Sequence, residues 1–456
     1  MQNDVYIKNA KIYSYDNSRE FNPSEKYAEA INLSIKSDPK VYNAVRELLM
    51  SMNLDKKNIG TKEWNPFKDF IELNDCVLIK PNFVKHINEG PGDLNCLITN
   101  FSVIRPIIDY TILALNGTGK IIIGDAPVQE CDFNQLKKID GLEKNILKYK
   151  SIFKNIFLID FRKNQNPDIN CKLVDIGQDS EFYELDNKSK EYSITNYDLK
   201  LMNSHHINGK HEYIIPEDVL MADVIINIPK PKSHRKAGMT ACMKNFVGIN
   251  GNKECLPHHR TGDPSRNGDE FPERSIIKNA FSYFSKLSYL NNRFLEFVRW
   301  KIFKILKISK KDRFVEGSWY GNDTIWRTIL DLNKLIIYAD KQGKLSKQPQ
   351  RKILNIADMI ISGEKEGPLL PSNKEVGLLV AGFNQLNIDF VISQIMGFAP
   401  DKIKYIKQGY ELNKRKISNS KVFKVFDDNG IVENIDIYNK HFSATDGWQD
   451  YLEGEK

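Results

Sequence analysis

The sequence predicts an α/β protein: a mainly parallel sheet flanked by helices, with an inserted helical segment. Three short apolar runs, within residues 75–82, 120–127 and 223–231, each end at a proline. Such runs are typical of inner strands of a parallel sheet. A helical pattern over residues 102–115 separates the first two runs, and a strand–helix–strand order of this kind implies a right-handed parallel crossover.

Further elements are expected before, between and after these strands. They are a helix near 36–52, a strand at 156–161, helical stretches at 275–311 and 323–339, strands at 353–362 and 376–382, and a helix at 384–396. Residues 250–274 are polar and turn-rich, as an ordered surface loop is. We therefore divide the chain into a strand and helix extension (1–74), an α/β core (75–410) with a basic helical insertion near 275–315, and a C-terminal tail (411–456).

Positive charge is concentrated in one segment. The net charge is +7, and residues 293–313 hold eight cationic side chains against Glu296 and Asp312. The rest of the chain is near neutral, so no nucleic-acid partner is expected. Residues 291–311 combine apolar side chains at helical spacing with lysines, arginines, Phe and Trp, a pattern typical of a helix in a membrane interface. A helix docked on the domain with solvated lysines, or paired in a dimer, is the alternative.

The cysteines argue against a bound iron–sulfur cluster. All six are scattered and none forms a Cys-x-x-Cys pair, so neither a cluster nor a disulfide framework is expected. The first residues lack the apolar stretch of a signal peptide, and no run reaches the roughly 18 apolar residues that span a bilayer. We expect a cytoplasmic protein, with residues 291–311 as a peripheral contact at the inner face of the membrane.

Polar side chains follow all three strand tips. Parallel strands bring their carboxyl ends to one edge of a sheet, where ligands bind, so these side chains are expected to converge. Lysines suit phosphate or carboxylate groups, and a histidine suits proton transfer near neutral pH. The predicted catalytic residues are Lys232, His234 and Lys244, and the predicted ligand-binding residues are Lys80, Asn82, Lys230 and Asn245. The alternative is a solvated basic loop.

Carboxylates near the same tips could hold a divalent cation, Mg²⁺ or Zn²⁺. Asp125 ends the second strand, and Asp358 and Glu366 flank a glycine-bearing acidic loop, which suits Mg²⁺. His258 and Asp263 form a second candidate pair, although their spacing matches no standard zinc pattern. The alternative interpretation of each carboxylate is that it forms a turn or an internal ion pair.

At these residues the chain resembles the family catalogued as domain of unknown function 362. The shared pattern comprises residues 77–82, 122–127, 222–234, 243–248 and 358–368, continuing through Ala381-Gly382, Asp389 and 396–398. The resemblance implies one α/β unit and names no reaction. Some relatives carry appended ferredoxin-like cluster motifs, which this chain lacks, so that role is not carried over.

The leading hypothesis is an enzyme of unknown reaction class. Its substrate would be an anionic small molecule, phosphorylated or a nucleotide- or lipid-linked sugar. No Walker loop, nucleophile elbow or dinucleotide-binding glycine fingerprint narrows the chemistry. The alternative is a non-catalytic ligand-binding or redox accessory protein that works with an iron–sulfur partner.

Overall fold

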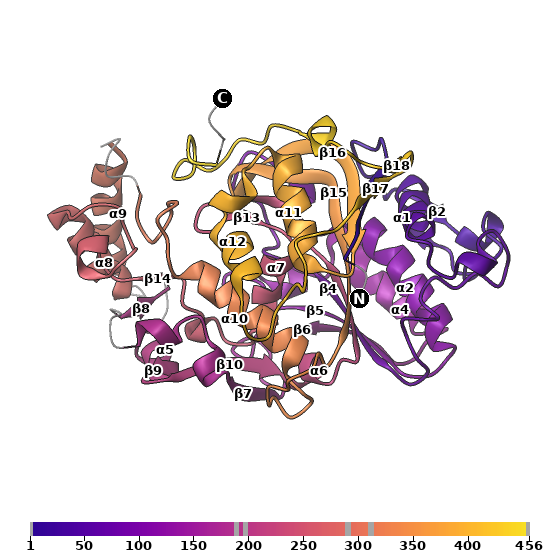
Figure 1. The fold of residues 1–456 in the computed structure, drawn as a ribbon, viewed down its shortest axis with the longest axis horizontal. Coiled ribbons are helices and arrows are strands. Elements are labelled where there is room, and N and C mark those ends of the chain that lie inside the picture. Colours follow the sequence, from indigo (N-terminus) through magenta and orange to yellow (C-terminus); the bar gives the residue numbers. More distant parts are fainter. Residues whose placement is uncertain (1–2, 187–190, 195–198, 288–292, 309–313, 453–456) are drawn as a thin grey trace.

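One large sheet runs through the protein (Figure 1). The structure is a computed structural model that describes residues 3–186, 191–194, 199–287, 293–308 and 314–452. Its main path has the order β18-β17-β1-β16-β15-β11-β4-β5-β6. The bounds are β1 Val5–Asn9, β4 Cys76–Pro81, β5 Lys120–Asp125, β6 Ile156–Asp160, β11 Val224–Ile228, β15 Lys352–Glu366, β16 Leu370–Gly382, β17 Val425–Asp427 and β18 Gly430–Ile431.

The five neighbouring strands β15, β11, β4, β5 and β6 are parallel, as the sequence predicts. The residues of β11 are all buried, which explains why its sequence is apolar on both faces. Helix α2 (Phe101–Leu115) connects β4 to β5. It begins where the Asn100 side chain accepts a hydrogen bond from the Ser102 N–H, and it ends at Asn116 in the left-handed conformation. The predicted α/β fold is confirmed.

Both chain ends contribute strands beyond the parallel part. β16 is antiparallel to β15, β1 is antiparallel to β16, and β17 is parallel to β1. Strand β1 belongs to the predicted N-terminal extension and β17 to the predicted tail. Both segments therefore complete the main sheet.

Helices cover both faces of this sheet (Figure 1). Helices α1 (Pro39–Ser51), α2 and α4 (Leu142–Tyr149) pack on the face that presents Val77 and Ile79. Helices α7 (Cys242–Asn245), α10 (Ile325–Tyr338), α11 (Gln385–Met396) and α12 (Lys404–Glu411) pack on the opposite face, with Leu78 and Ile225. The alternation along each strand thus divides the apolar core into two layers.

Shorter elements lie outside the main path of the sheet. Strands β12 (Lys232–His234) and β13 (Gly238–Thr240) form a hairpin on β15. The remaining strands are β2 Glu20–Phe21, β3 Ile35–Lys36, β7 Cys171–Asp175, β8 Tyr192–Ser193, β9 His206–Ile207, β10 Lys210–Pro216 and β14 His259–Arg260. The remaining short helices are α3 Phe133–Leu136, α5 Leu199–His205 and α6 Glu217–Leu220.

The predicted basic helical insertion forms two packed helices. Helices α8 (Ile276–Lys286) and α9 (Arg293–Ile308) lie beside each other and project from the body at the left of Figure 1. Lys310, Lys311 and Arg313 of the predicted basic segment lie outside the described residues. Over the described ranges, no helix is both long enough and apolar enough to cross a bilayer.

Candidate functional site

The tips of β4 and β5 meet at a buried ion pair. Lys80 Nζ lies 2.7 Å from Asp125 Oδ1, and Lys80 also donates to the Pro81 carbonyl at 2.8 Å. The Phe83 N–H donates to the other oxygen of Asp125 at 2.7 Å. A Cβ at Gly248 would lie 2.0 Å from Asp125 Oδ1, so only glycine fits beside this pair. The predicted convergence of the first two strand tips is confirmed.

Asparagine side chains connect the strand tips to α7. The Asn245 amide donates to the Asn227 side chain at 2.7 Å and to the Lys80 carbonyl at 3.2 Å, while its oxygen accepts from the Asn82 amide at 3.0 Å. Asn227 lies on β11 and Asn82 follows β4, so Asn245 fixes α7 against both strands. A buried network that is satisfied in this way holds one geometry.

Two further predicted residues, Lys230 and Lys232, are fully buried beside this network. Lys230 Nζ lies 2.7 Å from Asp358 Oδ2 and donates to the Ile361 carbonyl at 2.9 Å. Lys232 donates to the Leu97 carbonyl at 2.6 Å and to Asn82 Oδ1 at 3.2 Å. We call Lys80, Lys230 and Lys232 the strand-tip lysines. Their ammonium groups are each bonded to protein oxygens.

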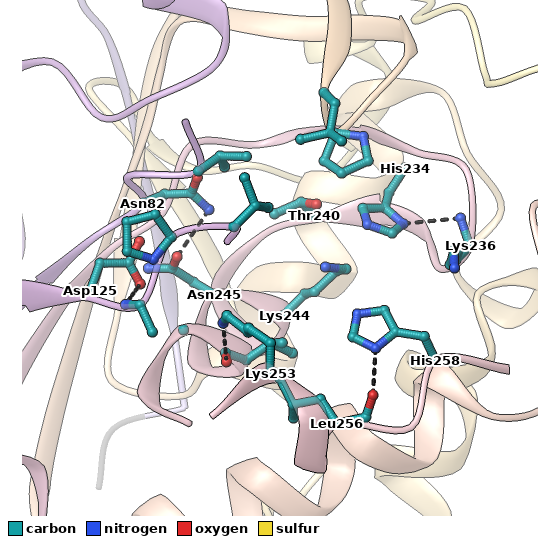
Figure 2. Close-up of a pocket in the computed structure, with 18 of the residues that line it drawn as sticks. Asn82, Asp125, His234, Lys236, Thr240, Lys244, Asn245, Lys253, Leu256 and His258 are labelled. Atoms are coloured by element: carbon teal, nitrogen blue, oxygen red, sulfur yellow. Dashed lines mark hydrogen bonds between the residues drawn. The ribbon is translucent and has the colours of Figure 1, made fainter. Parts of the chain in front are cut away.

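Above the strand tips lies a cavity of about 260 Å³ (Figure 2). Loops after β4 and β5, the β12–β13 hairpin, α7 and the loop that follows it supply its walls, and Pro368 and Leu369 of the β15–β16 turn also line it. The charged and polar side chains that line it are Asn82, Asp125, Glu130, His234, Arg235, Lys236, Thr240, Lys244, Asn245, Lys253 and His258. Cationic side chains therefore outnumber carboxylates in the lining, and one of the carboxylates, Asp125, is already paired with Lys80.

Three lysines of the lining differ from the strand-tip lysines. We call Lys236, Lys244 and Lys253 the cavity lysines. Among the residues that the structure describes, the ammonium groups of Lys236 and Lys244 have no hydrogen-bond or ion-pair partner, and that of Lys253 has only a 3.5 Å contact with the Val247 carbonyl. Burial, followed by the charges of Lys253 and Lys236, lowers the pKa of Lys244 to about 7. Burial also lowers the pKa of Lys236 and of Lys253 to about 8.

Two histidines face the same cavity with opposite hydrogen-bonding roles. His234 Nδ1 accepts from the N–H groups of Lys236 and Ala237 at 3.0 and 3.1 Å, so the neutral ring carries its hydrogen on Nε2. His258 Nδ1 lies 2.7 Å from the Leu256 carbonyl, which only accepts, so this ring carries its hydrogen on Nδ1 and has a free lone pair on Nε2. His234 thus offers the cavity a donor, and His258 offers it an acceptor.

Burial and neighbouring cations keep both histidines neutral. Burial, followed by the charges of Lys244 and Arg235, lowers the pKa of His234 well below its usual value. The pKa of His258 is likewise well below its usual value because of burial and the charge of Lys236. Figure 2 shows the Lys244 side chain extending toward the space between the two rings. An anion bound there would offset these cations and raise the pKa of each basic group.

Helix α7 holds Lys244 in place through contacts at both of its ends. Asp389 of α11 accepts hydrogen bonds from the Cys242 and Met243 N–H groups at 2.7 and 3.0 Å. Asn333 of α10 donates to the Met243 carbonyl at 2.9 Å. These contacts fix the backbone before Lys244, and the side-chain hydrogen bonds of Asn245 fix the residue after it, so Lys244 is held at the cavity wall.

The family model described as Domain of unknown function (DUF362) matches residues 181–394. The chain carries a DUF362 domain. The family assignment from the sequence is thereby confirmed, and a comparison with curated proteins finds no match. The matched DUF362 segment contains both histidines, the three cavity lysines and Asp389. Lys80, Asn82 and Asp125 precede it, so the cavity joins DUF362 residues to an earlier part of the chain.

The carboxylates that the sequence predicts as metal ligands have ion-pair or hydrogen-bond partners within the protein. Asp125 and Asp358 pair with lysines, and Glu366 accepts from the Asp446 N–H at 2.7 Å. Asp263 accepts from the Ser265 N–H at 3.0 Å and does not line the cavity that His258 faces. Over the described part of the chain, no three His, Cys, Asp or Glu side chains are grouped as metal ligands are.

The position of two residues, Lys253 and His258, in the cavity wall was not identified from the sequence. Lys253 was not selected, because it lies in a turn-rich loop with no strand or motif beside it. His258 was selected only as a metal ligand. The DUF362 pattern includes Asp389, a single carboxylate in the apolar helix α11. Only the structure shows that its side chain accepts hydrogen bonds at the start of α7.

Proposed function

We propose that the protein is an enzyme that binds a phosphorylated small molecule in the cavity between His234 and His258. The observation that carries this proposal is the Lys244 ammonium, which faces the cavity without a partner among the described residues. Leaving a buried charge unpaired is unfavourable, and an anionic ligand would remove that cost. Lys236 and Lys253 add further positive charge to the same walls.

The two histidines support a proton-transfer reaction. His258 Nε2 has a free lone pair and is assigned the general base, while the Nε2–H of His234 donates a hydrogen bond to the bound substrate. Lys244, with a pKa of about 7, can hold or release a proton near neutral pH and would stabilise negative charge that develops as the base acts. This differs from the role predicted from sequence, in which His234 moves the proton.

A metabolite extract tests this function without a known substrate. Wild-type protein and His258→Gln would each be incubated with the extract, and phosphorylated compounds would be quantified by mass spectrometry. We expect depletion of at least one compound by the wild type alone. Release of a bound compound unchanged by both proteins would instead favour the non-catalytic binding protein. Metal analysis of the same samples tests for the divalent cation expected from the sequence.

We also propose that α9 rests on an anionic membrane surface, the inner face of the cell membrane. Ile302 and Leu306 pack toward Phe281 of α8, whereas Phe294 and Phe297 remain 70% and 55% exposed. Lysines lie among the exposed rings, with Lys304 Nζ 3.9 Å from the centre of the Trp300 ring. Aromatic rings mixed with cations suit a lipid interface, and each Lys near anionic headgroups contributes about 1 kcal/mol.

Vesicle co-sedimentation tests this contact. Wild-type protein should sediment with vesicles that contain anionic lipid, and a Lys301→Glu/Lys304→Glu variant should stay in the supernatant. Leu173→Glu, an exposed change on β7, is the control and should behave as the wild type. Recovery of the wild type in the supernatant with both anionic and neutral vesicles would rule the contact out.

A further inference from the structure

The Lys244 amine has the surroundings of a nucleophile. It lines the cavity without a hydrogen-bond or ion-pair partner among the residues that the structure describes, and it extends toward the space between the two histidine rings (Figure 2). Burial and the charges of Lys253 and Lys236 lower its pKa to about 7. About half of this amine is therefore neutral at neutral pH, with a free lone pair, as in lysines that attack carbonyl compounds.

The two histidines supply the proton transfers that an attacking amine needs. An amine that adds to a carbonyl group must lose protons, and the carbonyl oxygen must gain them before it leaves as water. His258 Nε2 has a free lone pair, and His234 carries its hydrogen on Nε2. A proton acceptor and a hydrogen-bond donor therefore flank the Lys244 side chain.

A third group in the cavity wall, the Thr240 hydroxyl, is also unused within the described part of the protein. Thr240 lies on β13 and is only 3% exposed, and its Oγ1 has no hydrogen-bond partner there. A buried hydroxyl without a partner is unfavourable, and a ligand oxygen would supply the missing bond. A hydrogen bond from Thr240 to a carbonyl oxygen would make the carbonyl carbon easier to attack.

Apolar side chains form much of the remaining wall of this cavity. They include Val84, Ala126, Val128, Val247, Leu256 and Leu369. An apolar wall packs against the carbon skeleton of a ligand and excludes water, which would otherwise hydrolyse an imine. The cavity thus combines a free amine, acid and base groups, a free hydroxyl and a surface that limits hydrolysis.

We propose that Lys244 forms an imine with a phosphorylated aldehyde or ketone. The inference rests on the proposed function, from which it takes the phosphate site and the two histidines, and it adds the substrate class and a covalent step. The ammonium groups of Lys236 and Lys253 remain to bind the phosphate. The imine nitrogen, once protonated, keeps the positive charge that Lys244 contributes to the cavity.

The covalent step needs no further reactant. The neutral Nζ of Lys244 attacks the carbonyl carbon, and one electron pair of the C=O bond moves to the oxygen, which accepts a hydrogen bond from Thr240. His258 Nε2 transfers the two amine protons to this oxygen in turn. The C–O bond breaks, the nitrogen lone pair forms the C=N bond, and the oxygen leaves as water. The protonated imine then withdraws electrons from the neighbouring carbon, whose proton the base can remove.

Reductive trapping with glycolaldehyde phosphate tests this inference. The protein would be mixed with an equimolar amount of this phosphorylated aldehyde, cyanoborohydride would reduce the imine to a stable amine, and peptide mass spectrometry would locate it. We expect a single adduct at Lys244. An exposed lysine such as Lys144 on α4 has on the order of a thousandfold less neutral amine at pH 7, so it should stay unlabelled. Inorganic phosphate should slow the labelling by competing for the same site.

Three variants separate the covalent role from the binding of anions. Lys244→Arg keeps the positive charge and cannot form an imine, so it should lose the adduct and still bind inorganic phosphate in a calorimetric titration. Thr240→Val removes the hydroxyl and should slow the labelling of Lys244. Lys144→Arg makes the same exchange at an exposed lysine and should behave as the wild type in both measurements.

The outcomes distinguish this inference from the proposed function. Phosphate binding by the wild type without an adduct at Lys244 would overturn the imine and leave the anion site standing. An adduct at Lys236 or Lys253 instead would overturn the assignment to Lys244. Equal labelling by glycolaldehyde, which lacks the phosphate, would overturn the phosphorylated substrate class. Failure both to bind phosphate and to form the adduct would overturn the proposed function and the inference together.

Discussion

The strand-tip lysines and the cavity lysines lie in adjacent parts of one site and have opposite surroundings. Lys80 and Lys230 each pair with a buried carboxylate at 2.7 Å, and Lys232 donates to a carbonyl and an amide. Lys236 and Lys244 have no such partner among the described residues. The first set holds the strand tips together through these contacts, and we propose that the second set binds a ligand.

This distinction was not evident from the residue types alone. It predicts that removing a carboxylate partner from the first set and removing a lysine from the second set change stability in opposite directions. Removing a partner from the strand-tip set should destabilise the protein, while removing a cavity lysine should stabilise it and weaken the binding of anions.

The largest effect is expected at the Lys230–Asp358 pair. Asp358→Ala leaves the Lys230 ammonium buried without its carboxylate, which should lower the free energy of unfolding by about 3–5 kcal/mol. Denaturant unfolding monitored by circular dichroism measures this. The double variant Lys230→Met/Asp358→Leu removes both charges and should lose less than the single variant. A single variant as stable as the wild type would contradict a structural role for the pair.

A smaller loss of stability is expected from a substitution at Gly248. The Cβ of Gly248→Ala would lie 2.0 Å from Asp125 Oδ1 and 2.8 Å from Lys80 Nζ, so the ion pair must shift. Such overpacking costs about 1–3 kcal/mol. The same unfolding measurement tests it, and an unchanged midpoint would show that the strand tips are less tightly fixed than the geometry indicates.

A gain in stability, rather than a loss, is expected from a substitution at Lys244. Its pKa is about 7 in the folded protein and about 10.4 in an unfolded chain, so the folded state disfavours the charged form. This cost is complete below about pH 7, decreases as the folded state loses its proton first, and vanishes above about pH 10. Lys244→Met should therefore stabilise the ligand-free protein at neutral pH, by at most about 4 kcal/mol for a shift of about 3 pKa units at about 1.4 kcal/mol each, with the gain fading toward pH 10.

A matched control keeps this prediction specific. Lys144 on α4 is exposed, and Lys144→Met should change stability by less than about 0.5 kcal/mol at either pH. Thermal unfolding of the three proteins at neutral and at alkaline pH makes the comparison. If Lys244→Met lost stability at neutral pH, its charge would have to be compensated in the folded protein, against our interpretation.

Sequence patterns predicted the strand tips because their signals are local. Apolar runs that end at Pro81, Pro127 and Pro229 predict the three strands. The polar residues next to these prolines are therefore predicted to lie at the strand tips. The pairing of lysines could not be predicted in this way. Lys230 and Asp358 are 128 positions apart, and only the parallel packing of β11 on β15 brings their segments together.

The roles of the two histidines could not be predicted from the sequence either. The sequence shows that His234 and His258 exist, whereas their tautomers depend on which backbone groups the Nδ1 atoms contact. Strand β1 is a similar case, since its position between β16 and β17 depends on partners near the other end of the chain.

The most direct test of the central claim is the proton balance of anion binding. Inorganic phosphate would be titrated calorimetrically into the wild type, Lys244→Met and Lys144→Met at about pH 8, in two buffers of different ionisation enthalpy. A bound anion raises the pKa of the cavity lysines, so the wild type and Lys144→Met should take up protons as they bind. Lys244→Met should bind at least about tenfold more weakly and take up fewer protons. Identical binding by all three proteins, without proton uptake, would contradict the account.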